Sequence, residues 1–164
     1  MKYFKKEDIL LTDFDGVFLN SQERFDEDMN GEIDSKLWEI YLNNLDWIKF
    51  LKECEEMPGA TEVFKELIEK EILKGFLLQI HTIPEGLAKA NLIREKGIYI
   101  PIYYVLAPQK KSLIYPPKEN IILLDDKIRN AIDWEENGGK AILYNCKTKK
   151  KNMTYINNLS DLLK

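Results

Sequence analysis

Five short apolar runs, separated by segments with helical periodicity, are the feature that most constrains the fold of this chain. The runs cover residues 8–13, 75–81, 102–106, 120–125 and 141–144. Their lengths are typical of buried strands. Apolar residues recur at helical spacing in four other segments, residues 61–74, 85–96, 128–137 and 155–163. Strands that alternate with helices predict an α/β fold with a parallel sheet, because parallel neighbours need a crossover connection and are covered on both faces.

Two acidic residues follow the first run, in the stretch Leu-Leu-Thr-Asp-Phe-Asp-Gly at residues 10–16. If residues 9–12 are extended, side chains alternate faces, so Asp13 and Asp15 are expected to project from the same face about 7 Å apart. Two carboxylates this close need a cation or a shared proton, because like charges repel. The stretch therefore indicates a functional site at the end of the first strand.

Residues 20–58 interrupt the alternation directly after this acidic pair. The segment holds eleven Asp and Glu residues against four Lys and Arg, a net charge of −7 in a chain whose net charge is −4. Its aromatic residues recur at near-helical intervals, and we expect them to pack between helices rather than to stack on a substrate. The aromatic residues at these intervals are Trp38, Tyr41, Trp47 and Phe50. Ligands of open α/β sheets bind beyond the carboxyl ends of the strands, so we expect a small helical cap at residues 20–58 over a catalytic core of residues 1–19 and 59–164.

The composition argues against several classes of protein. A hydrophobic content of 45% suffices for one buried core in 164 residues. The negative net charge gives no basic surface, so binding of extended nucleic acid is not expected. Cys54 and Cys146 lack the spacing of a zinc site or a disulfide framework. The first residues do not resemble a signal peptide and no apolar run approaches the ~20 residues of a membrane span, so we expect a cytoplasmic protein without a membrane partner.

Polar side chains follow four of the five predicted strands. In chain order these are Asp13 with Asp15, His81 with Thr82, Lys110 with Lys111, and Asp125 with Asp126. Because the carboxyl ends of parallel strands lie at one edge of the sheet, these groups are expected to converge on one pocket. Clustered carboxylates favour a hard cation such as Mg²⁺, and a hydroxyl with an ammonium group suits phosphoryl oxygens. The set of side chains indicates phosphoryl chemistry.

These residues resemble the four motifs of the haloacid dehalogenase-like (HAD) superfamily of phosphohydrolases. The first motif, an apolar strand followed by Asp-x-Asp-Gly-Val, is similar to residues 13–17. The second, a strand ending in Thr or Ser, fits Thr82, and the third, a Lys before a helix, fits Lys111 or Lys110. The fourth, an acidic pair after a strand, fits residues 125–126. The resemblance implies a Rossmann-like core with a five-stranded parallel sheet in the order 5-4-1-2-3 and a cap inserted after the first strand.

Within the superfamily, the sequence looks most like the 5'(3')-deoxyribonucleotidase type and its phage and bacterial relatives. The resemblance rests on a Thr-x-Pro second motif and on the fourth block. In this chain the fourth block is Asp125, Asp126, Asn130, Trp134, Gly138 and Gly139. It implies a Mg²⁺-dependent phosphomonoesterase that releases phosphate from nucleoside monophosphates.

The resemblance also implies a role for each motif residue. Asp13 would be the nucleophile that forms an aspartyl-phosphate, and Asp15 would protonate the leaving alkoxide and then deprotonate the attacking water. Mg²⁺ would be held by Asp13, the main-chain carbonyl of Asp15 and Asp126, with Asp125 orienting this set. The phosphoryl oxygens would be bound by Thr82 and Lys111.

Two motif positions leave a choice. We assign the third motif to Lys111 rather than Lys110, because Leu113 and Ile114 follow it at the spacing that buries a helix face. His81, the only histidine, stands next to Thr82. Since the superfamily places the function on Thr82, we expect His81 to be a packed or hydrogen-bonded neighbour.

Three alternative functions compete with the nucleotidase. A response-regulator receiver also combines acidic residues, Mg²⁺, Thr and Lys, but its acidic pair is adjacent at the first strand and its Lys follows the last, whereas Lys111 here precedes the Asp125-Asp126 pair. A phosphatase for another small phosphomonoester, or for the terminal phosphate of a nucleic acid, would keep the same fold. A non-catalytic binding module is disfavoured, because every expected catalytic position is filled.

Overall fold

The computed structural model describes residues 1–29 and 34–164. Its centre is one parallel sheet in the order β3-β2-β1-β4-β5-β6. The strands are β1 Ile9–Thr12, β2 Leu73–Ile80, β3 Ile102–Leu106, β4 Ile121–Asp125, β5 Lys140–Tyr144 and β6 Thr154–Ile156. The predicted α/β class with a parallel sheet is confirmed. The predicted order of five strands is also found, but a sixth strand extends the sheet beside β5.

The sixth strand replaces part of a predicted helix. Residues 155–163 were expected to be helical, but β6 ends at Ile156 and only Leu159–Leu163 forms a 3₁₀ helix. Leu159 and Leu162 are buried, and a 3₁₀ helix places residues three apart on one side. The three-residue strand is too short to show an alternating pattern. The apolar spacing of the 3₁₀ helix therefore made the whole of residues 155–163 look helical.

A similar error concerns the start of β2. The periodicity predicted a helix over residues 61–74, whereas helix α4 covers Ala60–Glu69 and β2 begins at Leu73. Glu71 lies between them with φ of 60°, in the left-handed region that ends helices. Ile72 is buried like the helical residues before it, so the pattern did not mark the turn.

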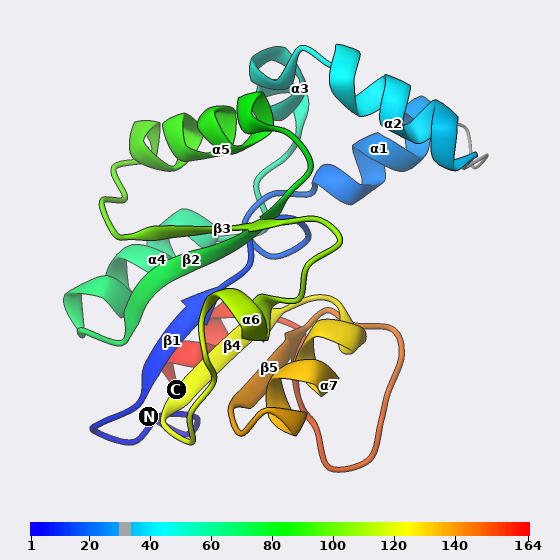
Figure 1. Ribbon diagram of the computed structural model, residues 1–164. Helices are drawn as coiled ribbons and strands as arrows, with labels where there is room; N and C mark the ends of the chain where they lie inside the picture. The colour runs from blue at the N-terminus through cyan, green and yellow to red at the C-terminus, as the bar shows by residue number, and fades with distance from the viewer. Residues whose placement is uncertain (30–33) are drawn as a thin grey trace.

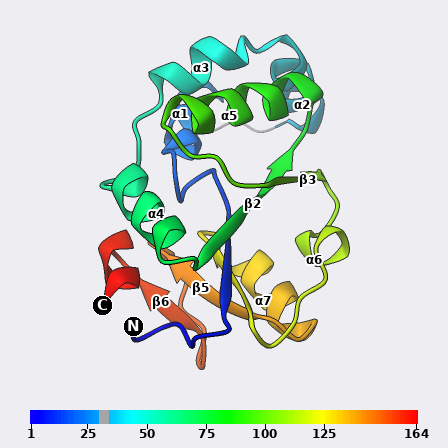
Figure 2. The same cartoon turned by 90° about the vertical axis from the view of Figure 1, so that its left-hand side faces the viewer.

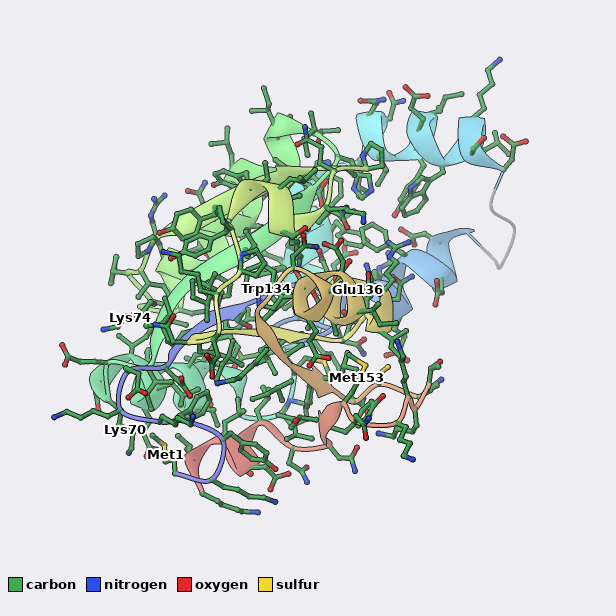
Figure 3. The ribbon with its side chains drawn as sticks, turned by 60° about the horizontal axis from the view of Figure 1, so that its bottom comes forward. Met1, Lys70, Lys74, Trp134, Glu136 and Met153 are labelled. Atoms are coloured by element: carbon green, nitrogen blue, oxygen red, sulfur yellow. The ribbon has the colours of Figure 1, made fainter. Side chains whose placement is uncertain are left out.

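The two faces of the sheet are covered by different helices. Along β2, Phe76 and Leu78 pack into the larger hydrophobic cluster, with residues of α4 and of helix α5, Ile83–Glu95. Leu77 packs on the other face with Trp134 of helix α7, Ile128–Glu136. Figure 2 shows α4 on one side of the sheet and α7, with the short helix α6 (Lys111–Ile114), on the other. Trp134, labelled in Figure 3, is fully buried and donates from Nε1 to the carbonyl of Ile121 at 3.2 Å.

The segment between β1 and α4 contains three helices, which lie together with α5 at one end of the sheet (Figure 1). They are α1 Ser21–Met29, α2 Ser35–Asn44 and α3 Trp47–Glu53. The two ends of the segment meet, because Met57 N donates to Phe18 O at 2.9 Å and Asn20 N to Glu55 O at 2.8 Å. The division into a core and a cap at residues 20–58 stays a prediction, and the three helices fall inside that range.

The aromatic residues of this segment pack mainly on one another. The ring of Phe25 stacks on Phe50 with centroids 4.5 Å apart and meets Trp38 edge-on at 5.3 Å. Trp47 and Phe50 belong to the same hydrophobic cluster as residues of the sheet core. Burial of these rings therefore stabilises the insertion and joins it to the rest of the protein.

Across the described ranges, none of the helices is both long enough and apolar enough to cross a membrane.

Candidate active site

The chain turns sharply where β1 ends. Asp13 directly follows β1 and its N–H donates to the carbonyl of Leu124 at 2.9 Å. The carbonyl of Phe14 then accepts the N–H of Phe18 at 2.8 Å, and Gly16 takes a φ of 75°. β1 is extended over Ile9–Thr12 as assumed, but the chain turns directly after it, so the alternation of the strand does not continue to Asp15 and a shared face for Asp13 and Asp15 stays a prediction.

Gly16 is required at this turn for two reasons. Its φ lies in the region that favours glycine. A Cβ at this position would also lie 2.3 Å from Oδ2 of Asp126. The first and fourth motifs thus touch each other through this glycine.

Three carboxylates from the ends of β1 and β4 converge. Asp13, Asp125 and Asp126 each offer an oxygen within 4.8 Å of the others. Asp125 already accepts hydrogen bonds on both oxygens, from Lys111 Nζ at 2.7 Å, Lys127 N at 2.8 Å and Asn130 Nδ2 at 3.0 Å. By contrast, Oδ1 of Asp126 is buried and finds no hydrogen-bond partner in the described part of the chain, and the buried Oδ1 of Asp13 has an ion pair with the Lys111 ammonium at 2.9 Å.

Burial and repulsion shift the pKa values of these two groups. Burial raises the pKa of Asp13 to about 6, although the nearby Lys111 ammonium opposes the shift. Burial, followed by the charges of Asp125 and Asp13, raises the pKa of Asp126 to about 8. Clustered carboxylate oxygens are the ligands that a hard divalent cation prefers. The oxygens of Asp13 and Asp126 could therefore hold a metal ion, with Asp125 fixed beside them by its own hydrogen bonds.

Lys111 supplies positive charge to this cluster. Its Nζ lies 2.9 Å from Oδ1 of Asp13 and 2.7 Å from Oδ2 of Asp125, and its side chain is buried. Although burial lowers the pKa of Lys111, Asp125 and Asp13 raise it above its usual value, so it stays charged. Lys110 is exposed and pairs with Asp133 at 2.7 Å. The reason we gave for preferring Lys111 is nevertheless wrong, because Leu113 is 71% exposed and Ile114 39%.

The carboxylate of Asp15 belongs to a second charged group. Its Oδ2 accepts from Lys89 Nζ at 2.6 Å and its Oδ1 from Ser21 Oγ at 2.5 Å. Lys89 is fully buried, also pairs with Glu85 at 2.6 Å, and lies 5.5 Å from the ring centroid of Phe14. Burial raises the pKa of Asp15, but the Lys89 ammonium outweighs it and holds this pKa below its usual value. Sequence reasoning missed Lys89, whose only local signal is the Glu85–Lys89 spacing on α5.

Thr82 and His81 lie at the start of α5. The hydroxyl of Thr82 accepts from Glu85 N at 3.2 Å and so caps this helix. No hydrogen bond or ion pair joins Thr82 to the carboxylate cluster within the described ranges. His81 donates its N–H to Glu85 Oε2 at 2.6 Å, and its ring meets Trp38 edge-on at 6.1 Å. His81 is thus a hydrogen-bonded neighbour that also lines a cavity with Lys111.

Two cavities flank the carboxylate cluster. The first, of about 590 Å³, is lined by residues that include His81, Lys111 and Arg129. The second, of about 1150 Å³, includes Gly16, Asp126 and again Arg129 in its lining. Both volumes exceed that of a phosphate group, so a small phosphorylated molecule has room beside the carboxylates.

Comparison with known proteins identifies the fold. No protein-family model and no curated protein matches the sequence. A predicted phosphatase from Clostridium acetobutylicum gives a TM-score of 0.67 at 13% identity, over 94% of this chain and 95% of that one. CbbY from Rhodobacter sphaeroides in complex with phosphate gives a TM-score of 0.64 at 15% sequence identity, over 94% of this chain and 96% of that one. The HAD-hydrolase YfnB from Bacillus subtilis bound to magnesium gives a TM-score of 0.63 at 15% sequence identity, over 96% of this chain and 97% of that one. The chain therefore has the Rossmann-like fold of HAD-superfamily hydrolases.

Replacement of Lys89 by Met should destabilise the protein by about 3 kcal/mol, because the carboxylates of Asp15 and Glu85 would lose their buried counter-ion. Urea denaturation followed by tryptophan fluorescence measures this loss. The exposed Lys65 serves as the control, and Lys65→Met should change the free energy of unfolding by no more than about 0.5 kcal/mol. Equal small effects of both substitutions would contradict the buried ion pair.

The metal-free protein should lose stability as the pH rises from 5 to 8.5. The folded-state pKa values of Asp13 and Asp126 are raised to about 6 and about 8, so both groups bind protons at pH 5 that the unfolded chain has released. The stability from these protons is lost as the pH passes those values, by an amount on the order of 5 kcal/mol. Asp15 has a lowered pKa and is ionised throughout this range. Thermal unfolding in a chelator measures the trend, which Asp126→Asn should flatten; stability that is constant or rises with pH would contradict it.

Proposed function

We propose that this protein is a Mg²⁺-dependent phosphomonoesterase of the HAD superfamily that acts through an aspartyl-phosphate on Asp13. The observation that carries the proposal is the convergence of three buried or half-buried carboxylates, in which Oδ1 of Asp126 has no hydrogen-bond partner in the described ranges and Oδ1 of Asp13 faces the Lys111 ammonium at 2.9 Å. The shared fold with HAD hydrolases supports the same reaction class by analogy.

The donor set fits the proposed cation. Asp13, Asp126 and the main-chain carbonyl of Asp15 would hold Mg²⁺, and Asp125 would orient them through its bonds to Lys111 and Asn130. Bound Mg²⁺ would neutralise the carboxylates and withdraw charge from the phosphoryl oxygens. Oxygen ligands alone, without His or Cys among the three clustered residues, favour this ion over zinc.

The reaction would proceed in two displacements. A carboxylate oxygen of Asp13 attacks phosphorus while the bond to the leaving alkoxide breaks, and the alkoxide takes a proton from Asp15. A water molecule then attacks the phosphorus and gives its proton back to Asp15, while the bond to Asp13 breaks and inorganic phosphate leaves. Lys111 would face the phosphoryl oxygens on which negative charge lies. The predicted contact from Thr82 stays part of this proposal.

The contacts of Asp15 bear on its two proposed steps differently. Its ion pair with Lys89 favours the carboxylate form, which suits the acceptance of a proton from water. The first step requires the protonated form. An anionic phosphate that enters beside Asp15 adds negative charge and raises its pKa, because a like charge disfavours ionisation. Substrate binding would therefore prepare Asp15 for proton donation.

A nucleoside monophosphate is the proposed substrate, as the resemblance to deoxyribonucleotidases implies. Part of that resemblance concerns folding rather than recognition. Trp134 is buried beneath the sheet, and a Cβ at Gly139 would lie 2.3 Å from its Nε1. These two residues of the fourth block pack against each other, so they support the reaction class more than the choice of base or sugar.

Asp13→Asn should abolish phosphate release while the protein stays folded, because an amide cannot form the aspartyl-phosphate and the buried site loses a charge rather than a packed group. The assay is phosphate release over deoxy- and ribonucleoside monophosphates, sugar phosphates and 3'-phosphorylated oligonucleotides. Asp161→Asn, in the C-terminal 3₁₀ helix where Asp161 pairs with the exposed Lys164, is the matched control and should keep its activity. Turnover retained by Asp13→Asn would reject the nucleophile. Preference for nucleoside monophosphates supports the substrate, whereas activity on oligonucleotide ends alone rejects it.

Removal of metal should stop phosphate release, and added Mg²⁺ should restore it, because the buried carboxylates otherwise carry unbalanced charge. Calorimetric titration of Mg²⁺ into the metal-free protein provides a second readout. Binding should be lost in Asp126→Asn and kept in the exposed control Asp34→Asn. A rate that is insensitive to chelator, or Mg²⁺ binding unchanged by Asp126→Asn, would contradict the metal site.

A further inference from the structure

A groove leads away from the carboxylate cluster between helix α1 and the loops that follow β4 and β5. It is the cavity of about 1150 Å³ that has Gly16 and Asp126 in its lining. The α1 side contributes Glu23 and Asp26, and the side of the strand ends contributes three cationic residues. Figure 1 shows α1 and α7 on the two sides of this region.

The three cations of the groove are Lys127, Arg129 and Lys147, which we call the groove cations. In the ranges that the structure describes, none of them forms a salt bridge, and the guanidinium of the exposed Arg129 has no hydrogen bond either. The other lysines near the site differ in this respect. Lys89, Lys110 and Lys111 each have a carboxylate oxygen within 2.7 Å.

The carboxylates of α1 do not neutralise the groove cations. Glu23 accepts from the amide of Asn20, and Asp26 accepts from the amide of Gln22 at 2.9 Å. An anion in the groove would therefore be attracted to the strand-end side and repelled from α1. This arrangement suits one compact anionic group and disfavours a long polyanion, which would have to pass Glu23 and Asp26.

Arg129 is placed to meet such a group near the reacting phosphate. It stands three residues after Asp126, in the first turn of α7. Arg129 lines both cavities: it shares the cavity of about 1150 Å³ with Asp126 and the cavity of about 590 Å³ with Lys111. Its planar guanidinium can bind a phosphate or carboxylate with two parallel hydrogen bonds.

We propose that Arg129 and Lys147 bind a second anionic group of the substrate, so that the protein prefers phosphomonoesters that carry a further phosphate or carboxylate close to the one that is hydrolysed. This inference rests on the proposed phosphomonoesterase. Among nucleotides it favours a nucleoside bisphosphate over the monophosphate, and among simple esters a bisphosphate over an alkyl phosphate.

The test compares substrates that differ by one anionic group. Phosphate release is measured for a nucleoside 3',5'-bisphosphate against the 5'-monophosphate, and for propane-1,3-diyl bisphosphate against propyl phosphate. Arg129→Gln and Lys147→Gln should each raise the KM of a bisphosphate by about fivefold, the effect of removing one exposed ion pair. The KM of the matching monophosphate and the kcat of both should stay unchanged. Lys151→Gln, an exposed lysine of the same loop outside the groove, should change nothing.

The outcomes separate this inference from the proposed function. The inference is supported if either substrate pair shows a preference for the bisphosphate that Arg129→Gln removes. It is overturned if neither pair shows a preference, or if Arg129→Gln reduces phosphate release equally from mono- and bisphosphates. If the wild-type protein releases no phosphate at all, the proposed function fails, and calorimetric binding of propane-1,3-diyl bisphosphate and propyl phosphate decides the inference. Tighter binding of the bisphosphate that depends on Arg129 then supports it, and equal binding overturns it.

Discussion

The parallel pairing of β1 with β4 is the constraint on which the candidate site depends. The register sets Thr12 beside Leu124, so the next residues, Asp13 and Asp125, lie side by side at the carboxyl edge of the sheet. Their carboxylates are then forced into a buried position where like charges repel. Lys111, reached through the crossover from β3, lies between them and offsets part of this repulsion. The site is thus a consequence of strand order rather than of any local sequence motif alone.

Two lysines divide the acidic residues into groups with different electrostatics. Lys111 contacts Asp13 and Asp125 but not Asp126, and the pKa values of Asp13 and Asp126 are raised. Lys89 contacts Asp15 and Glu85, and the pKa of Asp15 is lowered. Two aspartates that are separated by one residue in the sequence therefore have opposite shifts. In the metal-free protein this difference is opposite to the one that the first proposed step needs, which is an ionised nucleophile and a protonated donor. A bound cation would lower the pKa of Asp13, and an anionic substrate would raise that of Asp15.

Features carried by single strands could be predicted from the sequence. The apolar runs indicated the parallel sheet, and the resemblance to HAD phosphohydrolases supplied its order. The acidic residues at the ends of β1 and β4 indicated the carboxylate cluster, because that inference needs only the rule that parallel strands end at one edge. Features that depend on contacts between distant segments could not be predicted. Lys89 meets Asp15 across 74 positions, and nothing in the spacing of α5 distinguishes Lys89 from a surface lysine. Strand β6 was missed because its three residues pair with β5 only once the sheet exists.

The insertion after β1 is held by the same burial that stabilises the sheet. Phe25, Trp47 and Phe50 share a hydrophobic cluster with residues of the sheet core. The buried ammonium of Lys89 lies 6.0 Å from the ring centroid of Trp47, on α3, while it binds Asp15 of the core. The position of Asp15 is thus coupled to the packing of α3 against α5, since moving either helix would expose or unpair a buried charge at considerable cost. In this protein the helices of the insertion therefore help to fix the position of Asp15.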